Sequence, residues 1–119
     1  MANLSTRAYV AGFTSVMIAG FILGPDGFAH LEIVGIGPTI GFDLPAVQDP
    51  VLELHDLNGI LIAFNDDCGQ APTPPPIVPT YPTESCIEAT LPAGAYTAIL
   101  SGKTNDDTGV ALVEIYNFE

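Results

Sequence analysis

The sequence predicts an all-β protein, built as a single two-sheet antiparallel β-sandwich of the jelly-roll kind with about eight strands. Three observations predict it. Valine, isoleucine, threonine, tyrosine and phenylalanine dominate the periodic stretches. Glycine and proline turn signals separate these stretches at short intervals. No stretch has the length and periodicity of a helix. The 119 residues suit one domain, which we expect to span 1–119.

Two strands are expected at the N-terminus, at 3–10 and 13–23, with a bend at Ala11-Gly12. The second is apolar on both faces, which suits a central strand. The apolar run from 6 to 24 could instead be a targeting or membrane segment, but polar residues interrupt it and a turn and another strand follow directly. We therefore expect strands here, and any export signal to lie outside this sequence.

The next strand is expected at 28–36, followed by a loop that contains prolines. Residues 51–56 alternate cleanly, and Asn58-Gly59 favours a tight turn into a strand at 60–64, so a β-hairpin is predicted. The proline-rich segment 71–85 cannot be a central strand and is expected to be a surface loop. Three more strands are expected, at 86–91, 95–101 and 108–118.

The charge balance is strongly acidic. The chain has 14 acidic residues against 2 basic ones and a formal net charge of −12, yet 48% of it is hydrophobic and its mean hydropathy is +0.40. Nucleic acids and anionic membrane surfaces are excluded as partners, because both require clustered Lys and Arg. Only 13% of residues are charged, so either the surface is rich in neutral polar residues or part of its apolar area is buried against a partner.

Three segments carry a family resemblance: DPVLELHDLNGILIAFNDD at 49–67, LPAGAYTAILSG at 91–102 and TGVALVEIYNF at 108–118. In this order they resemble the bacterial pre-peptidase C-terminal type of β-sandwich. The resemblance implies a secreted module of the kind found near the C-termini of long bacterial surface proteins, and some such modules use calcium. Two departures are that Cys68 stands where the family often has Trp, and that the strand before Gly37-Pro38 lacks the usual Arg or Lys.

Cys68 and Cys86 bracket the proline-rich segment. Their spacing matches no common zinc motif and no CxxC is present, so a disulfide is favoured over a redox or metal pair. A disulfide implies an oxidising compartment, so we expect an exported protein at the cell surface or outside the cell.

Catalysis is not expected. Neither His30 nor His55 has a nucleophile in its sequence context, and no GxSxG or HExxH motif occurs. No cofactor is required by this inventory. Calcium is the one candidate ion, because Asp49, Asn65, Asp66 and Asp67 could supply hard oxygen ligands. The alternative is that these residues only stabilise turns through their own backbone.

Glycans are a further candidate partner. Asn3 begins an Asn-Leu-Ser acceptor pattern, and hydroxyl residues set among prolines resemble O-glycosylated stretches. The candidate acceptors in the second group are Thr73, Thr80, Thr83 and Ser85. The alternative is a bare exposed loop.

The N-terminal segment 1–10 has two interpretations. It could be an ordinary edge strand of the sandwich, or a strand donated to the next copy of the chain. In the second case one face would fill a groove in the neighbour and Arg7 would find a carboxylate; the filling residues would be Leu4, Thr6, Ala8 and Val10. Such a head-to-tail contact does not close on itself and generates a filament.

We therefore expect a non-enzymatic extracellular structural subunit whose partner is itself, and which assembles through strand edges without entering a membrane. The alternative is a calcium-dependent accessory module that binds polysaccharide or a cell surface.

Overall fold

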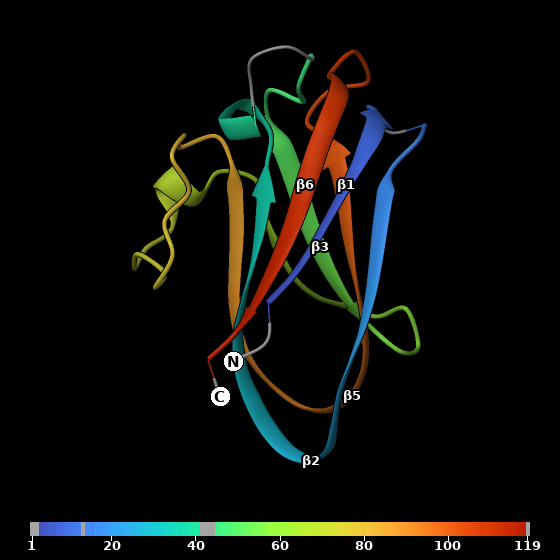
Figure 1. Cartoon of the computed structure of the whole chain (residues 1–119), viewed down its shortest axis with the longest axis vertical. Coiled ribbons are helices and arrows are strands. Elements are labelled where there is room, and N and C mark those ends of the chain that lie inside the picture. The colour runs from blue at the N-terminus through green and yellow to red at the C-terminus, as the bar shows by residue number, and fades with distance from the viewer. Residues whose placement is uncertain (1–2, 13, 41–44, 119) are drawn as a thin grey trace.

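The computed structural model describes residues 3–12, 14–40 and 45–118. Within them, six strands form one continuous, strongly bent antiparallel sheet in the order β1-β6-β2-β5-β3-β4 (Figure 1). The strands are β1 Asn3–Ala11, β2 Met17–Ile36, β3 Pro50–Asp56, β4 Leu61–Asn65, β5 Ser85–Gly102 and β6 Thr108–Asn117. Two short 3-10 turns, η1 Pro38–Ile40 and η2 Cys68–Gln70, complete the elements. The predicted all-β class is confirmed.

The bending of β2 and β5 makes the sandwich. Figure 1 shows both long strands turning back at the same end of the molecule. The register between them shifts between Leu23 and Phe28, so each strand is divided into two arms. The first layer is β1, β6, residues 28–36 of β2 and residues 85–92 of β5. The second layer is residues 17–23 of β2, residues 94–102 of β5, β3 and β4.

Two predicted turns are therefore bends within strands. The Gly-Pro-Asp-Gly signal at 24–27 lies inside β2 and the Pro-Ala-Gly signal at 92–94 lies inside β5. Each bend carries one strand from one layer to the other, as corners do in orthogonally folded sheets. At the N-terminus, β1 reaches Ala11 and β2 begins only at Met17, later than the predicted 13.

The core lies between the layers and is filled by alternate residues of each strand. In β3, Leu52 and Leu54 point inward, and Ala98 and Leu100 of β5 lie beside them in the register. From the first layer, the core receives a matching set of buried apolar residues, among them Val10, Leu31, Ile33, Ile87, Val113 and Ile115.

The proline-rich segment packs against the sandwich instead of projecting freely from it. The disulfide between Cys68 and Cys86 joins its two ends. Ile77 donates its backbone N–H to the Glu32 carboxylate at 2.8 Å, and Glu32 is fully buried although it lies on a strand face turned away from the core. At the far end of the segment, the buried Glu84 accepts backbone N–H groups from Gly37 and Thr39 at 2.9 Å each.

The segment ends one residue earlier than predicted, because Ser85 is the first residue of β5. In the described part of the chain, no helix is long and apolar enough to cross a membrane.

Candidate functional site

Three carboxylates meet at one end of the second layer. Asp49 directly precedes β3, and Asp66 and Asp67 directly follow β4. Because β3 and β4 form an antiparallel hairpin, the start of one lies beside the end of the other. Each of the three residues offers an oxygen atom, and these atoms all lie within 4.8 Å of one another. The hairpin therefore assembles the acidic cluster from residues far apart in sequence.

Neighbouring loops fix the position of Asp49. Its backbone N–H donates to the Asp107 carboxylate at 2.9 Å, and its backbone carbonyl accepts the N–H of Lys103 at 3.0 Å. The Lys103 ammonium forms an ion pair with Asp66. One oxygen, Oδ1, of each of the three cluster aspartates is buried and has no hydrogen-bond partner within the described residues.

Burial raises the pKa of Asp49 from its usual value to about 7, and the neighbouring Asp66 and Asp67 add to the shift. The same cluster raises the pKa of Lys103, chiefly through its hydrogen bond to Asp66. A single lysine therefore faces three carboxyl groups. One of them, Asp49, is partly protonated at neutral pH because its pKa is about 7.

The cluster fits a hard divalent cation. Calcium takes about six to eight oxygen ligands, and carboxylates with free lone pairs are the ligands it prefers. Three such groups converge here, and a bound cation would relieve their mutual repulsion. The remaining predicted ligand, Asn65, has its side-chain oxygen on the backbone N–H of Cys86 at 3.0 Å. The structure therefore brings Asp49, Asp66 and Asp67 together and uses Asn65 to tie β4 to β5.

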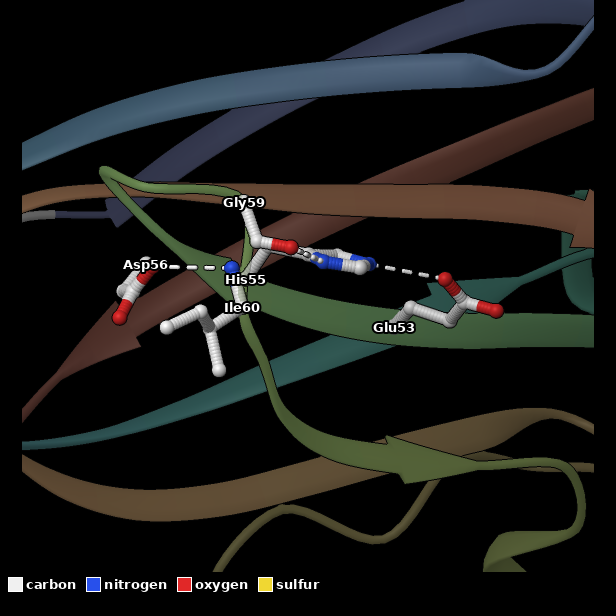
Figure 2. Close-up of polar contacts among 5 residues, drawn as sticks. All are labelled: Glu53, His55, Asp56, Gly59 and Ile60. Atoms are coloured by element: carbon white, nitrogen blue, oxygen red, sulfur yellow. Dashed lines mark hydrogen bonds and ion pairs between the residues drawn. The ribbon is translucent and has the colours of Figure 1, made fainter.

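The tip of the β3–β4 hairpin is held by its own polar contacts (Figure 2). Asp56 accepts the backbone N–H groups of Asn58 and Ile60 at 2.9 and 3.0 Å. His55 bridges the Gly59 carbonyl through Nδ1 at 3.1 Å and the Glu53 carboxylate through Nε2 at 2.8 Å. Gly59 has φ +81°, as its place in the predicted turn favours, whereas φ of Asn58 is not positive. The Gly59 N–H donates to the Asp56 carbonyl at 3.0 Å, so Leu57 and Asn58 are the central residues of the turn.

Both partners of the His55 ring are acceptors, so both ring nitrogens must donate for the two hydrogen bonds to form together. This arrangement favours the protonated imidazole. The hydrogen bond to Glu53, followed by the one to Gly59, raises the pKa of His55.

The hairpin also exposes an apolar surface. Leu57 at the tip is 78% exposed, and Phe64 on β4 is 61% exposed. A register irregularity in the β3–β4 pairing sets Leu61 opposite His55 and leaves Ile62 as the extra residue of a bulge. Leu61 and Ile62 are both exposed. Within the described residues, β4 pairs with β3 only, so its other edge is free.

The opposite edge of the same layer is also free. Residues 17–23 of β2 pair with β5 on one side, whereas the pairing of β2 with β6 begins only at Leu31. On this arm Ile18 is 64% exposed, and Ile22 is exposed as well. A cavity of about 260 Å³ runs between this arm, β1 and β6. It is lined by Leu4, Ser5, Thr6, Ile18, Ala19, Gly20, Val113 and Ile115.

The N-terminal segment lies on its own chain. β1 pairs antiparallel with β6 from Asn3 opposite Tyr116 to Ala11 opposite Thr108. Val10 is buried in the core, Ala8 packs against it, and Leu4, Thr6 and Arg7 are exposed. This is the edge-strand arrangement.

The predicted O-glycan acceptors divide in two. Thr73, Thr80 and Thr83 are exposed. Ser85 is fully buried as the first residue of β5, so its expected place on an exposed loop is wrong. Asn3 begins β1.

Comparison with known proteins identifies the fold. No protein-family model matches the chain, and no curated protein matches it. Among solved structures, the chain is similar to the pre-peptidase C-terminal domain of a collagenase from Bacillus anthracis, with a TM-score of 0.56 and 11% sequence identity over 96% of this chain and 89% of that one. The chain has the fold of a pre-peptidase C-terminal domain. At this level of identity the likeness concerns the fold alone.

Sequence reasoning missed the free edges of this pre-peptidase C-terminal fold. The apolar pattern of residues 13–23 predicted a central strand, whereas residues 17–23 pair on one side only within the described residues. The pairing order is what places β4 at the other edge.

Proposed function

We propose that the chain is a non-enzymatic extracellular structural subunit that self-assembles through its strand edges into a filament. The observation that carries the proposal is the pair of apolar, unpaired edges on β4 and on residues 17–23 of β2. An unpaired edge presents a row of N–H and C=O groups to another chain, and most monomeric proteins protect such edges. Burying the apolar side chains against a second copy removes them from water.

Two further features support the proposal. Both cysteines are held in the disulfide, which suits an oxidising compartment outside the cell. Each histidine contacts a glutamate: His30 lies 2.6 Å from Glu88, and His55 binds Glu53. None of these residues forms a nucleophile–base pair, which supports a role without catalysis.

Negative-stain microscopy of the purified chain tests the proposal. We expect filaments of constant width that lengthen with protein concentration. A field of separate particles at every concentration would overturn it.

Exchange of β1 between copies is one route to such a filament. In that arrangement β1 leaves its own β6 and pairs with β6 of the next copy in the same register. A Ser5→Cys, Glu114→Cys double variant distinguishes an exchanged β1 from a β1 that stays on its own chain. These two residues lie opposite each other in the pairing of β1 with β6 and point away from the core, so a disulfide can join them. Oxidised filaments should run as covalent multimers on a denaturing gel if β1 is exchanged, and as monomers if it is not.

A second candidate function is a calcium-dependent module that attaches to polysaccharide or a cell surface. The specific observation in its favour is the three buried, unpartnered oxygens of Asp49, Asp66 and Asp67. Retention of the chain on insoluble polysaccharide in Ca²⁺, and its release by EDTA, would support this function. Equal retention in both conditions, or none in either, would contradict it.

We also propose Thr73, Thr80 and Thr83 as O-glycan acceptors, because they are exposed beside prolines on the outer side of the molecule. Intact mass of the natively produced protein tests this proposal. A mass equal to that of the bare polypeptide would reject it.

A further inference from the structure

The two free edges belong to one layer and lie at its opposite ends. The second layer runs from residues 17–23 of β2, through residues 94–102 of β5 and β3, to β4. Each inner strand of the layer is paired on both sides, whereas the two outer ones are paired on one side only within the described residues. A second copy can therefore extend the layer at either end.

The strand directions favour extension by simple repetition. Every pairing in the layer is antiparallel. Across the layer, β2 and β3 therefore run in one direction, and β5 and β4 in the other. A copy shifted sideways without rotation brings its β2 edge beside β4 of the first copy with the two strands antiparallel. The contact joins two different surfaces, so it does not close and continues indefinitely.

Neither edge carries charged or proline residues that would protect it against pairing. Natural edge strands are guarded by charged residues, by proline or by bulges. Residues 57–64 and 16–23 contain no charged residue and no proline. The bulge at Ile62 is the one protective feature of β4, and the apolar side chains of Leu61 and Ile62 are exposed beside it.

The outward-facing side chains at the two edges are both apolar and lie in the same row of the sheet. In the register, Ile18 lies opposite Ile99, Ile99 lies opposite Glu53, and Glu53 lies opposite Phe64. These four residues form one row across the outer face of the layer, with Ile18 at one end and Phe64 at the other. Repetition of the layer would place Phe64 of one copy beside Ile18 of the next and bury both.

The net charge of the chain also favours contact through the two uncharged edges. Copies with a net charge of −12 repel one another, and the repulsion is weakest where surfaces without carboxylates approach. The cavity beside residues 17–23 adds space for an incoming side chain next to Leu4 and Ile18, with the core residues Val113 and Ile115 in its lining.

We propose that β4 of one copy adds, antiparallel, to the free edge of residues 17–23 of β2 in the next copy, and that repetition of this contact builds the filament. This inference rests on the proposed assembly function and names the two surfaces that meet. The other occupants of these edges would be a second β4, which would give a closed dimer, or an exchanged β1.

Two variants test it, each of which blocks one edge. Phe64→Lys places a charge on β4 and leaves the β2 edge intact, and Ile18→Lys does the reverse. Both side chains are exposed, so neither change disturbs the core. Val78→Lys is the matched control, because Val78 is 64% exposed on the proline-rich segment and the charge change is the same. Circular dichroism and melting temperature confirm that each variant is folded.

We expect each blocked variant alone to remain a monomer of about 12.4 kDa in sedimentation, and the control to assemble at least as readily as the wild type. An equimolar mixture of Phe64→Lys and Ile18→Lys should give heterodimers and nothing longer, because only one productive contact remains.

The other outcomes are distinguishable. If Ile18→Lys alone forms dimers, β4 pairs with itself and the inference is wrong. If the blocked variants form filaments like the wild type, the inference is wrong and the assembly function stands. If the wild type itself never assembles, the inferred contact and the proposed assembly function are both wrong.

Discussion

Asp49 and Glu32 are carboxyl groups whose pKa values lie near 7 because burial removes water from their ionised forms. For Asp49 the other cluster aspartates add to the effect. For Glu32 the backbone N–H of Ile77 opposes it, while the adjacent Glu88 adds to it. Ionising either group therefore costs the folded state free energy that the unfolded chain does not lose.

This shift fixes the sign of a pH dependence. Unfolded Asp and Glu ionise near pH 4, whereas these two groups ionise near pH 7 in the folded state, so the folded state holds more protons in between. Stability should fall as pH rises from about 4 to 7, by on the order of a few kcal/mol in total. The raised pKa of His55 acts in the same direction above its usual value.

Thermal melts at pH 5 and pH 8 measure this effect. We expect the higher melting temperature at pH 5, and a smaller difference in the Asp49→Asn and Glu32→Gln variants. A wild type that is more stable at pH 8, in a buffer containing EDTA, would contradict the assignment.

Cation binding at the acidic cluster should counteract the cost of ionisation. At pH 8, millimolar Ca²⁺ should raise the melting temperature by several degrees, because a ligand that binds only the folded state stabilises it. Asp67→Asn should remove most of this shift.

Asp106→Asn is the matched control, because Asp106 is exposed in the turn before β6 and lies outside the cluster. It should retain the full response. An equal response in both variants would place the ion elsewhere, and no response in the wild type would reject the site.

At the level of single elements, the proline-rich segment is stabilised from both ends and covers part of β2. Its disulfide closes a loop between positions 18 residues apart. In the chain-entropy model a loop of this length contributes about 3 kcal/mol to stability by restricting the unfolded chain. The contacted residue is Glu32, which is buried on the side of the strand away from the core and accepts the backbone N–H of Ile77.

The Cys68→Ser, Cys86→Ser double variant should therefore lose about 3 kcal/mol of unfolding free energy in urea titration. Reduction of the wild-type protein should produce a similar loss. Hydrogen exchange should increase at the backbone N–H of Ile77, which binds Glu32 in the native fold. A loss below about 1 kcal/mol would mean that hydrogen bonds alone hold the segment.

Local patterns predicted most of these elements correctly. The hairpin at Asn58-Gly59 and the disulfide needed only short-range signals, because a glycine that adopts a positive φ favours a local chain reversal and two cysteines leave one pairing. The bends at 24–27 and 92–94 were predicted as turns between separate strands. Glycine and proline give the same signal in both cases, and only the pairing of the flanking arms distinguishes them.

The candidate sites were less predictable. Asp49 meets Asp66 because β3 and β4 pair, so the hairpin prediction already contained that contact. The role of Asn65 depends on Cys86 in another strand, and the burial of Ser85 depends on where β5 begins. The free edges depend on strand order across the whole sheet, which is a long-range property that no sequence window contains.

For the whole molecule, a net charge of −12 and two apolar edges act against each other. Repulsion between copies acts over the Debye length, which is about 10 Å at 0.1 M salt and longer below that. The contacts between edges are apolar and backbone interactions, which salt does not screen. Added salt should therefore promote assembly.

Light scattering measured at low and at 0.3 M NaCl tests this prediction. We expect faster growth at the higher concentration, and Val78→Lys should assemble faster than the wild type at low salt because it lowers the net charge. Filaments that dissolve as salt rises would instead indicate contacts made by ion pairs.

Sedimentation velocity of the wild-type chain over a concentration series, in 0.3 M NaCl, is the most direct measurement. The account predicts a boundary that moves from the 12.4 kDa monomer to ever larger species as concentration rises, with no preferred closed size. A single 12.4 kDa species up to millimolar concentration, or a single dimer, would contradict an open filament built through free strand edges.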